Sequence, residues 1–397
     1  MEKVVLAFSG GLDTSFCVPY LKNKKKLEVH TVMVNTGGFN KEEEKNIEER
    51  ALKLGAKTHT TIEAVDTYYK KGIKYLIFGN ILKNETYPLS VSSERIFQAL
   101  EVLKLVKKIK AEYVAHGSTG AGNDQVRFDL VFDVLAPEVK ILAPIRELEI
   151  GRKDEVDYLT EQGFNYSWEK AKYSINQGIW GTSIGGQETL NSEGYLPEEA
   201  YPHKAVKREE KKIKIDFKNG EPIALNGEKM APVALIKEVT NIAAPYGIGR
   251  DMHVGDTIIG IKGRVGFEAA APLIIIKAHH LLEKHVLTKT QLYWKGLIAE
   301  YYGQLMHEAQ YLEPAMRDME TFLESTQNSV SGSVEILLRP YSFMILGCKT
   351  NFDLMSSKFG EYGEVNKSYS GRDVIGFTKV LANPLKIYYS LHNQKEK

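Results

Sequence analysis

The chain has 397 residues, of which 43% are hydrophobic and 26% charged, and its formal net charge is +1. These values are typical of a soluble protein of two or three domains, and they argue against nucleic acid or an anionic membrane as the main partner. Two cysteines, Cys17 and Cys348, exclude a disulfide framework and a cysteine-rich metal site. This cysteine usage suits the reducing cytoplasm, where we expect the protein to act. We expect no signal peptide, because the apolar run after Lys3 ends at Ser9, and no membrane span, because no apolar run approaches ~18 residues.

Residues 1–165 alternate short apolar strands with amphipathic helices, a pattern that predicts an α/β domain with a parallel sheet covered on both faces. In such sheets, ligands bind at the carboxyl ends of the strands. Strands are expected at Val4–Phe8, Val29–Val34, Lys57–Ile62, Tyr113–His116 and Ile141–Ala143, and helices after Asp13 and at Lys41–Leu54, Ser93–Lys108 and Arg152–Gln162.

A glycine-rich turn, Ser9-Gly-Gly-Leu-Asp-Thr-Ser15, lies between the first strand and the first helix. Gly10 and Gly11 allow the backbone to approach a ligand closely and to adopt angles that other residues avoid. One of the side chains of residues 13–15 is expected to cap the helix. The free amides and the positive end of the helix dipole favour an anion such as pyrophosphate. The spacing is not that of a Walker A loop.

A second polar loop, Ala115–Arg127, has the sequence AHGSTGAGNDQVR and follows the fourth expected strand. Arg127 can hold a carboxylate with two parallel hydrogen bonds. Asn123 can pair with an amide-like group, and Asp124 can accept from an ammonium. Because both loops follow strands of one sheet, we expect them to converge on one site.

From about Asn165 the pattern changes to that of an α+β domain, followed by a helical tail. Three histidines, His279, His280 and His285, have no metal-site spacing and are interpreted as solvated side chains at a helix start. We expect a hairpin of Lys212–Phe217 and Glu221–Leu225 with Asn219-Gly220 in its turn, and a second antiparallel pair of Val334–Leu338 and Phe343–Leu346. A helical region is expected over Leu281–Gln327, interrupted near Pro314. A terminal helix over Gly376–Tyr389 is expected to pack on another subunit.

The first turn resembles the PP-loop of the ATP pyrophosphatases, and the form Ala7–Ser15 resembles that of argininosuccinate synthases. The Ala115–Arg127 loop is very similar to a stretch of the same family. The resemblance implies a PP-loop nucleotide-binding domain (1–165), a synthetase and multimerisation domain (166–373) and an oligomerisation tail (374–397) of a homotetramer. It also implies ATP-dependent joining of citrulline and aspartate through citrullyl-AMP, giving argininosuccinate, AMP and pyrophosphate, with Mg²⁺ accompanying ATP and no metal-binding residues assigned.

Individual roles follow from the same resemblance. Asp124 is the candidate to orient, or also to deprotonate, the aspartate ammonium, and Asp13 is the second candidate for a catalytic role. The implied ATP-binding residues are Ala7, Phe8, Ser9, Gly10, Gly11, Leu12, Asp13, Thr14, Ser15, Val34 and Gly117; the citrulline-binding residues are Tyr87, Ser92, Asn123, Arg127, Ser174 and Ser183; and the aspartate-binding residues are Thr119, Asn123 and Asp124.

The chain departs from the family pattern in two places. The segment that begins at Tyr87 matches a family stretch ending in Arg-Pro: Arg95 occupies the arginine position, whereas Ser90 and Ile96 stand for the usual glycine and proline. Taken alone, this segment would be a helix start capped by Ser92 or Ser93 with Arg95 solvated. Further on, Gly255 and Phe267 replace a glutamate and a tyrosine that bind citrulline in the family. Either Asp256 or Glu268 is a candidate to compensate through a local shift.

Two other functions stay open from the sequence. One alternative is another PP-loop ligase, such as a tRNA-modifying or amide-forming enzyme. The other is a nucleotide-binding protein without catalysis. A tRNA-modifying enzyme favours a basic RNA-binding surface, and a thiolating one also needs a cysteine pair. Neither feature is visible in the sequence.

Overall fold

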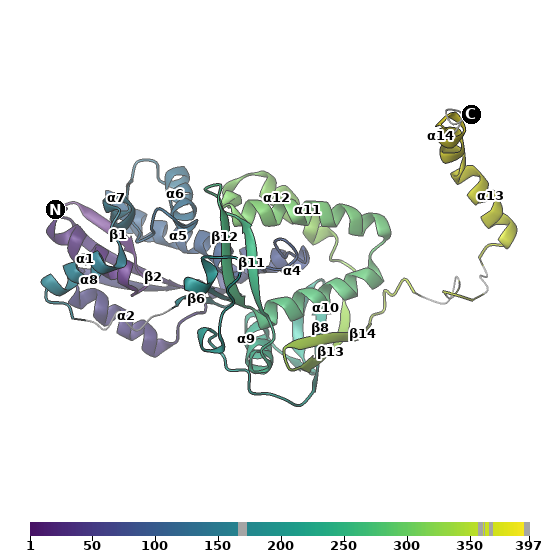
Figure 1. Cartoon of the computed structure of the whole chain (residues 1–397), viewed down its shortest axis with the longest axis horizontal. Coiled ribbons are helices and arrows are strands. Elements are labelled where there is room, and N and C mark those ends of the chain that lie inside the picture. Colours follow the sequence, from purple (N-terminus) through teal and green to yellow (C-terminus); the bar gives the residue numbers. More distant parts are fainter. Residues whose placement is uncertain (166–172, 356–359, 361, 365–367, 393–397) are drawn as a thin grey trace. The chain divides into compact units, whose positions relative to one another are not determined.

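The computed structural model describes residues 1–165, 173–355, 360, 362–364 and 368–392 (Figure 1). The chain forms two compact units, Met1–Asn351 and Phe352–Lys397. The expected boundary between residues 165 and 166 adjoins a segment outside the described residues. In the described part of the chain, no helix is both long and apolar enough to cross a membrane.

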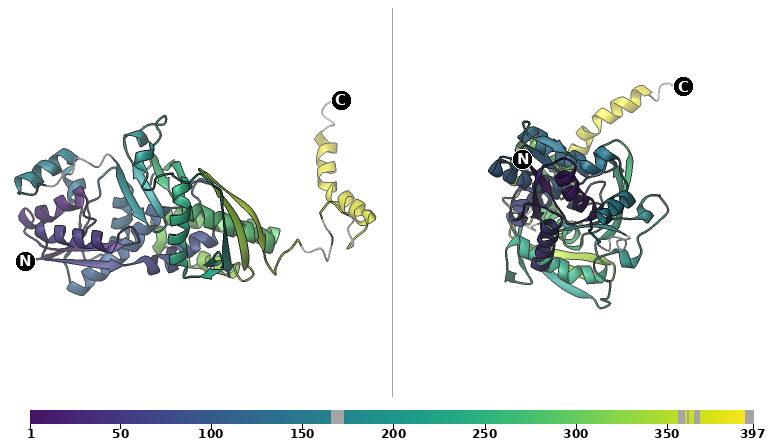
Figure 2. Two further views of the ribbon diagram at one scale, coloured as in Figure 1. Left: turned by 90° about the horizontal axis from the view of Figure 1, so that it is seen from below. Right: turned by 90° about the vertical axis from the view of Figure 1, so that its left-hand side faces the viewer.

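The first unit begins with a five-stranded sheet whose strands are parallel, as the sequence predicts, and whose order is β3-β2-β1-β4-β5. This part of the chain is coloured purple to blue, near the N-terminus, in Figures 1 and 2. Alternate residues of a strand face opposite sides of a sheet. In β1, Val4 and Leu6 therefore pack with the helices α1, α2 and α8, whereas Val5 packs with the core that includes α5 and α6. The strands are β1 (Lys3–Ala7), β2 (Glu28–Asn35), β3 (Thr58–Glu63), β4 (Tyr113–Ala115) and β5 (Lys140–Leu142), and the helices are α1 (Leu12–Asn23), α2 (Lys41–Lys53), α5 (Ser90–Ile109), α6 (Asp124–Leu135), α7 (Pro144–Leu148) and α8 (Arg152–Glu161).

Two antiparallel sheets follow in the same unit, of orders β11-β12-β7-β6 and β10-β9-β8-β13-β14. The expected hairpin is confirmed: Asn219 and Gly220 both have positive φ, as a tight hairpin turn requires. The expected pair near residue 340 is also confirmed. The strands are β6 (Ser174–Gly178), β7 (Gly181–Gly185), β8 (Lys211–Lys218), β9 (Glu221–Leu225), β10 (Glu228–Lys229), β11 (Arg250–Asp256), β12 (Lys262–Glu268), β13 (Gly332–Arg339) and β14 (Ser342–Lys349).

The expected helical region of this unit begins earlier and is interrupted twice. Its helices are α10 (Ala270–Val286), α11 (Lys289–His307) and α12 (Ala315–Ser325). The first break comes at Leu287, because Thr288 caps α11: its side chain accepts from the amide of Gln291. The second break surrounds Pro314, as expected. Smaller helical segments are α3 (Val65–Tyr68), α4 (Lys74–Phe78) and α9 (Pro232–Ala243).

The prediction that the three histidines are solvated at a helix start is wrong for His279, which is fully buried in the middle of α10. Its Nδ1 lies 2.6 Å from Oδ1 of Asn80, and its Nε2 lies 2.9 Å from Oε1 of Gln327. Nearby, the buried carboxylate of Glu283 pairs with Nζ of Lys295 at 2.9 Å. Burying charges is unfavourable unless they are paired and hydrogen-bonded, so this cluster joins α10, α11 and the end of α12.

The tail contains two helices, α13 (Gly371–Leu381) and α14 (Asn383–His392), where one was expected. Ser370 caps α13 by accepting from the amide of Asp373. The break falls before Pro384, which cannot continue a helix from the preceding turn. No residue of either helix is buried, and the apolar side chains of Val374, Ile375, Phe377, Val380, Leu381, Leu385, Ile387 and Leu391 are exposed.

The buried ion pair predicts a stability effect. Substituting Lys295→Met leaves the Glu283 carboxylate buried without its cation, so we expect the free energy of unfolding to fall by about 3–5 kcal/mol. Adding Glu283→Leu should restore part of that loss. Lys289→Met, at an exposed position of the same helix, should change it by less than about 0.5 kcal/mol. Urea denaturation of the four proteins measures this, and equal losses from the two lysine variants would contradict it.

Candidate active site

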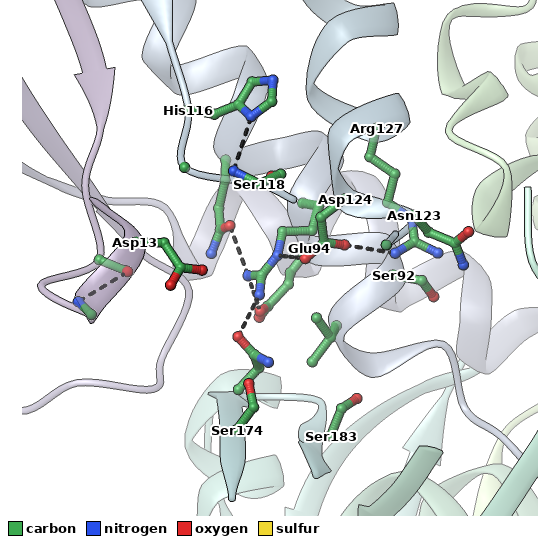
Figure 3. A pocket seen from close by; sticks show the side chains of 18 of the residues that line it. Asp13, Ser92, Glu94, His116, Ser118, Asn123, Asp124, Arg127, Ser174 and Ser183 are labelled. Atoms are coloured by element: carbon green, nitrogen blue, oxygen red, sulfur yellow. Dashed lines mark hydrogen bonds and ion pairs between the residues drawn. The ribbon is translucent and has the colours of Figure 1, made fainter. Parts of the chain in front are cut away.

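A cleft of about 1050 Å³ lies at the carboxyl ends of β1, β2 and β4, and β6, β7, β11, β12 and the end of α11 also contribute to its walls (Figure 3). Every residue assigned to the site from the sequence lines this cleft except Ser15, which is buried in α1. Figure 3 shows Asp13 on the first loop, the side chains of Glu94, Asn123, Asp124 and Arg127 gathered together, and Ser174 and Ser183 on neighbouring strands.

The first loop adopts a conformation that only one of its two glycines requires. Gly10 has a φ of +76°, and a Cβ there would lie 3.0 Å from Cγ1 of Ile47. Gly11, in contrast, has an ordinary φ of −72°, and a Cβ there would meet only Oγ of Ser9 at 3.4 Å. The expectation of unusual backbone angles is therefore correct for Gly10 and wrong for Gly11.

The prediction that Asp13, Thr14 or Ser15 caps α1 is also wrong. The helix begins at Leu12, and no side chain caps it. Thr14 instead donates from Oγ1 to the carbonyl of Gly11 at 3.3 Å. The first amides of α1 therefore have no side-chain acceptor, which leaves them available to an anionic ligand in the cleft.

Two carboxyl groups lie close together at the start of α1. Burial raises the pKa of Asp13 and, together with the negative charge of Asp13, raises the pKa of Glu155 to about 8. Oε2 of Glu155 is buried and has no hydrogen-bond partner among the residues that the structure describes. Two such carboxyls cannot both ionise easily at neutral pH unless a cation compensates their charge. Glu155 was not identified from the sequence, because it lies on α8, far along the chain.

The second loop is held by a relay of side chains behind it. His116 directly follows β4, and its ring is buried. Nδ1 of the ring accepts from the amide of Ser118 at 3.2 Å, and Nε2 lies 2.8 Å from Oδ1 of Asp129. Arg146 pairs with the other carboxylate oxygen of Asp129. Gln125 donates to the carbonyls of the loop at residues 120 and 122. The loop that carries Gly117 and Thr119 is therefore fixed by α6 and α7 rather than free to move as a surface loop.

A chain of three charged groups lies beside this loop. Asp124 accepts from Nε of Arg95 at 2.9 Å through Oδ2 and from Nη1 of Arg127 at 2.8 Å through Oδ1. Arg95 also donates to Asn176 on β6, and Arg127 donates from Nε and Nη2 to the carbonyl of His307 at 3.2 Å. Three separate elements are thus joined through one carboxylate.

The contacts with the two arginines decide the charge state of the Asp124 carboxyl group. Burial alone would raise the pKa of Asp124, but the charges of Arg95 and Arg127 lower it to about 2. The neighbouring Glu94 shows the reverse: burial raises its pKa to about 7 against the opposing charge of Arg95. Asp124 is therefore a permanent anion and a poor proton acceptor at neutral pH, so the geometry favours its orienting role over deprotonation.

Arg95 and Glu94 were missed from the sequence. The interpretation of Arg95 as solvated is wrong, since its side chain is only 13% exposed. The interpretation of Ser92 or Ser93 as a helix cap is also wrong, because α5 begins at Ser90 after Leu89, whose φ is +59°. The only available signal was that Arg95 occupies a family arginine position.

The part of the cleft assigned to citrulline is built from a hairpin and a turn. The hydroxyl of Tyr87 lies 3.1 Å from Oγ of Ser183 on β7, and it accepts from the amide of Val91 at 3.1 Å. The ring of Tyr87 stacks on His253, with centroids 5.2 Å apart. Ser174 lies on β6 and is exposed.

The expected compensation for Gly255 and Phe267 does not occur. Asp256 is exposed and pairs with Nζ of Lys262 at 2.6 Å. Glu268 does not line the cleft: its two oxygens bind His203 and Arg250. Neither carboxylate therefore replaces the missing glutamate.

Comparison with known proteins identifies the family. A family model described as the arginosuccinate synthase N-terminal HUP domain matches residues 3–165, and one described as the C-terminal domain of the same synthase matches residues 173–388. The chain belongs to the argininosuccinate synthase family. A relative named argininosuccinate synthase from Methanocaldococcus jannaschii is 38% identical over 96% of both chains. Relatives of the same name are 36% identical in Dictyoglomus thermophilum, over 96% of this chain and 95% of the relative, and 35% identical in Xanthomonas campestris, over 98% of both chains.

The two glycines of the first loop should differ in their tolerance of a side chain. Gly10→Ala places an alanine at positive φ, which costs roughly 1–2 kcal/mol, so we expect ATP affinity to fall about tenfold. Gly11→Ala meets neither strain nor a close neighbour and should bind ATP nearly as the native chain does. Isothermal titration calorimetry of both variants checks this, and equal affinities would show that the strained conformation is not needed for binding.

Glu94 should make stability fall as the pH rises. Its folded pKa of about 7 exceeds the ordinary value of 4.5, so the folded chain holds a proton that the unfolded chain releases between these values. The free energy of unfolding should decrease across that range, by about 1.4 kcal/mol for each unit of pKa difference. Glu94→Gln should remove the Glu94 part of this slope and leave the part that Glu155 contributes, whose pKa is also raised. Denaturation at pH 4.5 to 7.5 tests it, and an unchanged slope in the variant would assign the effect to other groups.

Proposed function

We propose that this chain catalyses the ATP-dependent joining of citrulline and aspartate to give argininosuccinate, AMP and pyrophosphate, as part of arginine biosynthesis in the cytoplasm. The observation that carries the proposal is the convergence of both glycine loops, from β1 and β4, on a single cleft. Family membership and the names of the relatives support the choice of reaction.

The proposed reaction has two steps. The ureido oxygen of citrulline attacks the α-phosphorus of ATP, forming citrullyl-AMP as pyrophosphate leaves. The amine of aspartate then attacks the activated ureido carbon, and AMP leaves. The uncapped amides of α1 would bind the departing pyrophosphate, and the rigid second loop would orient the amino-acid substrates, so positioning and charge stabilisation supply most of the rate.

ATP would lie along the first loop, with Ala7–Thr14, Val34 and Gly117 around it. Asp124 would face the ammonium of aspartate, next to Thr119 and Asn123. Tyr87, Ser92, Ser174 and Ser183 would surround citrulline together with Arg127. The guanidinium of Arg127 already binds the His307 carbonyl and Asp124, so it would hold a carboxylate only by its remaining hydrogens.

Mg²⁺ would accompany ATP, and the residues at the start of α1 fit it. This ion prefers oxygen ligands and is held by one or two carboxylates together with substrate phosphates. Asp13, with Glu155 behind it, offers two carboxyl groups whose raised pKa values a cation would relieve. When bound, Mg²⁺ would neutralise charge on the phosphates.

Release of pyrophosphate tests the proposal. The purified chain with ATP and Mg²⁺ should release pyrophosphate only when citrulline and aspartate are both present, with argininosuccinate as the second product. Release that requires a tRNA or an amide donor in their place would favour another PP-loop ligase. ATP binding without any release under all conditions would favour a non-catalytic nucleotide-binding protein.

Asp124 provides a sharper test of the assigned roles. Asp124→Asn removes the charge that faces the aspartate ammonium, so we expect full turnover to lose about 2–4 kcal/mol of transition-state stabilisation, a factor of roughly 30–1000. ATP–pyrophosphate exchange with citrulline alone should fall much less. Asp133→Asn, at an exposed position of the same helix, serves as the control. Equal losses in both assays would assign Asp124 to holding the cleft together rather than to aspartate.

We also propose that the chain works as a homotetramer, with a nucleotide-binding domain (1–165), a synthetase domain (166–373) and a tail (374–397) that docks on a neighbouring subunit. The apolar side chains of α13 and α14 support this, because they are exposed within their own unit.

Removal of the tail should therefore reduce the size of the particle. We expect a chain that ends at residue 370 to form smaller species than the full chain in light scattering. Phe377→Ser combined with Val380→Ser keeps the length but removes two exposed apolar groups, and it should have the same effect in part. An unchanged particle mass in both variants would exclude the tail from assembly.

A further inference from the structure

One end of the cleft is built around two histidines. His253 on β11 and His307 at the end of α11 both line it, beside Tyr87, Ser183 and Gly255; we call these five residues the histidine end. Tyr87 joins the group through its stacking on His253 and its contact with Ser183.

Both imidazoles are buried and neutral, and one nitrogen of each lacks a hydrogen-bond partner in the described part of the chain. His253 is 6% exposed and His307 is 7% exposed, and Nδ1 of each has no partner among the described residues. Burial lowers the pKa of His253 to about 4, and burial with the nearby charge of Arg127 lowers that of His307 to about 3. The positive charge of Lys83 also lowers the pKa of both histidines. A neutral imidazole offers one donor and one acceptor, so each ring has unused capacity toward a polar ligand.

Positive charges outweigh negative ones near the histidine end, where Asp124 alone opposes Lys83 and Arg127 in their effect on the pKa of His307. Lys83 lies close enough to both rings to disfavour their protonated forms, and Arg127 does the same for His307. A substrate ammonium placed here would meet the same repulsion. A substrate carboxylate would instead find two neutral rings and two cations.

None of the cleft-lining carboxylates of the described residues is dedicated to an ammonium at this end. Asp124 binds two arginines and, in the proposed function, faces the ammonium of aspartate, whereas Asp256 is exposed and pairs with Lys262. Glu94 binds Arg95 and Thr36. The other two lie elsewhere: Asp13 belongs to the first loop, and Glu43 accepts from the backbone amide that precedes α2.

Gly255 is required by this arrangement. A Cβ at this position would lie 2.8 Å from Nε2 of His253, so a side chain there would displace the ring. Nε2 therefore faces space that exists because residue 255 is a glycine. The ring of His253 occupies space that a side chain at residue 255, acidic or not, would need.

We infer that this site does not recognise the α-ammonium of its ureido substrate, and that ω-ureido carboxylates lacking the α-amino group are used with a kcat/KM no more than threefold below that for citrulline. The inference rests on the proposed function, because the chemistry is the same. The ureido oxygen forms a bond to the α-phosphorus, the bond to pyrophosphate breaks, and the α-amino group takes no part.

Comparison of citrulline with 5-ureidopentanoate, which is citrulline without its α-amino group, tests the inference. With ATP, Mg²⁺ and aspartate, the native chain should release pyrophosphate with a kcat/KM for 5-ureidopentanoate no more than threefold below that for citrulline. A site built to bind the ammonium would discriminate by several orders of magnitude. A preference for citrulline of more than threefold overturns the inference and leaves the proposed function intact. Release with neither compound overturns both.

A pair of variants tests the physical reason. His253→Ala makes room for a side chain at residue 255, and Gly255→Glu in that background adds a carboxylate to the histidine end. We expect the preference for citrulline to rise at least tenfold over the single variant. Gly255→Gln in the same background has nearly the same volume without the charge and should not raise it. Equal preferences in the two double variants would overturn the electrostatic argument.

Discussion

The ion-paired chain Arg95–Asp124–Arg127 is the interaction on which the rest of the cleft depends. Arg95 belongs to α5, Asp124 to the start of α6, and Arg127 reaches the last residue of α11 through a carbonyl oxygen. The guanidinium of Arg127 is buried and that of Arg95 is largely so, and such charges are stable only when they are paired, so the three elements must come together in one arrangement. Through Asn176, the same chain also positions the hairpin of β6 and β7. The assignment of Asp124 to the aspartate ammonium therefore places substrate recognition on the group that assembles the site.

The distance between the two glycine loops is determined by backbone pairing. β1 and β4 are adjacent in the sheet, and Leu6 pairs with Ala115. Each loop leaves its strand shortly after this pair, so the spacing between an ATP site and an amino-acid site would be that of two neighbouring strands. The hydrogen bonds of His116 then fix the second loop, whereas the first is held by the positive φ of Gly10 and by the hydrogen bond that its carbonyl accepts from Arg50. The cleft needs no large movement to bring the loops together.

The sequence predicts the parallel sheet well because most of its strands are short apolar runs, and the helices between them repeat their apolar residues every three or four positions. It predicts the residues that line the cleft through the two loops and the family resemblance. It fails where a residue depends on a distant partner: nothing near Arg95 indicates Asp124, and nothing near Asp13 indicates Glu155. His279 was placed in solvent because the start of α10, with Pro272 in its first turn, has no capping signal. The uncapped start of α1 runs against local propensity, as is expected where a ligand takes the place of a cap.

The contact between α5 and β6 constrains more than the geometry of the cleft. Gly178, at the end of β6, packs so closely on Glu94 that a Cβ at residue 178 would collide with Oε2 of the carboxylate. That oxygen also accepts from Thr36, so the side chain of Glu94 cannot turn away without losing a buried hydrogen bond. The two positions, 84 residues apart in the chain, therefore have to change together in evolution: a larger residue at 178 is compatible only with a smaller one at 94.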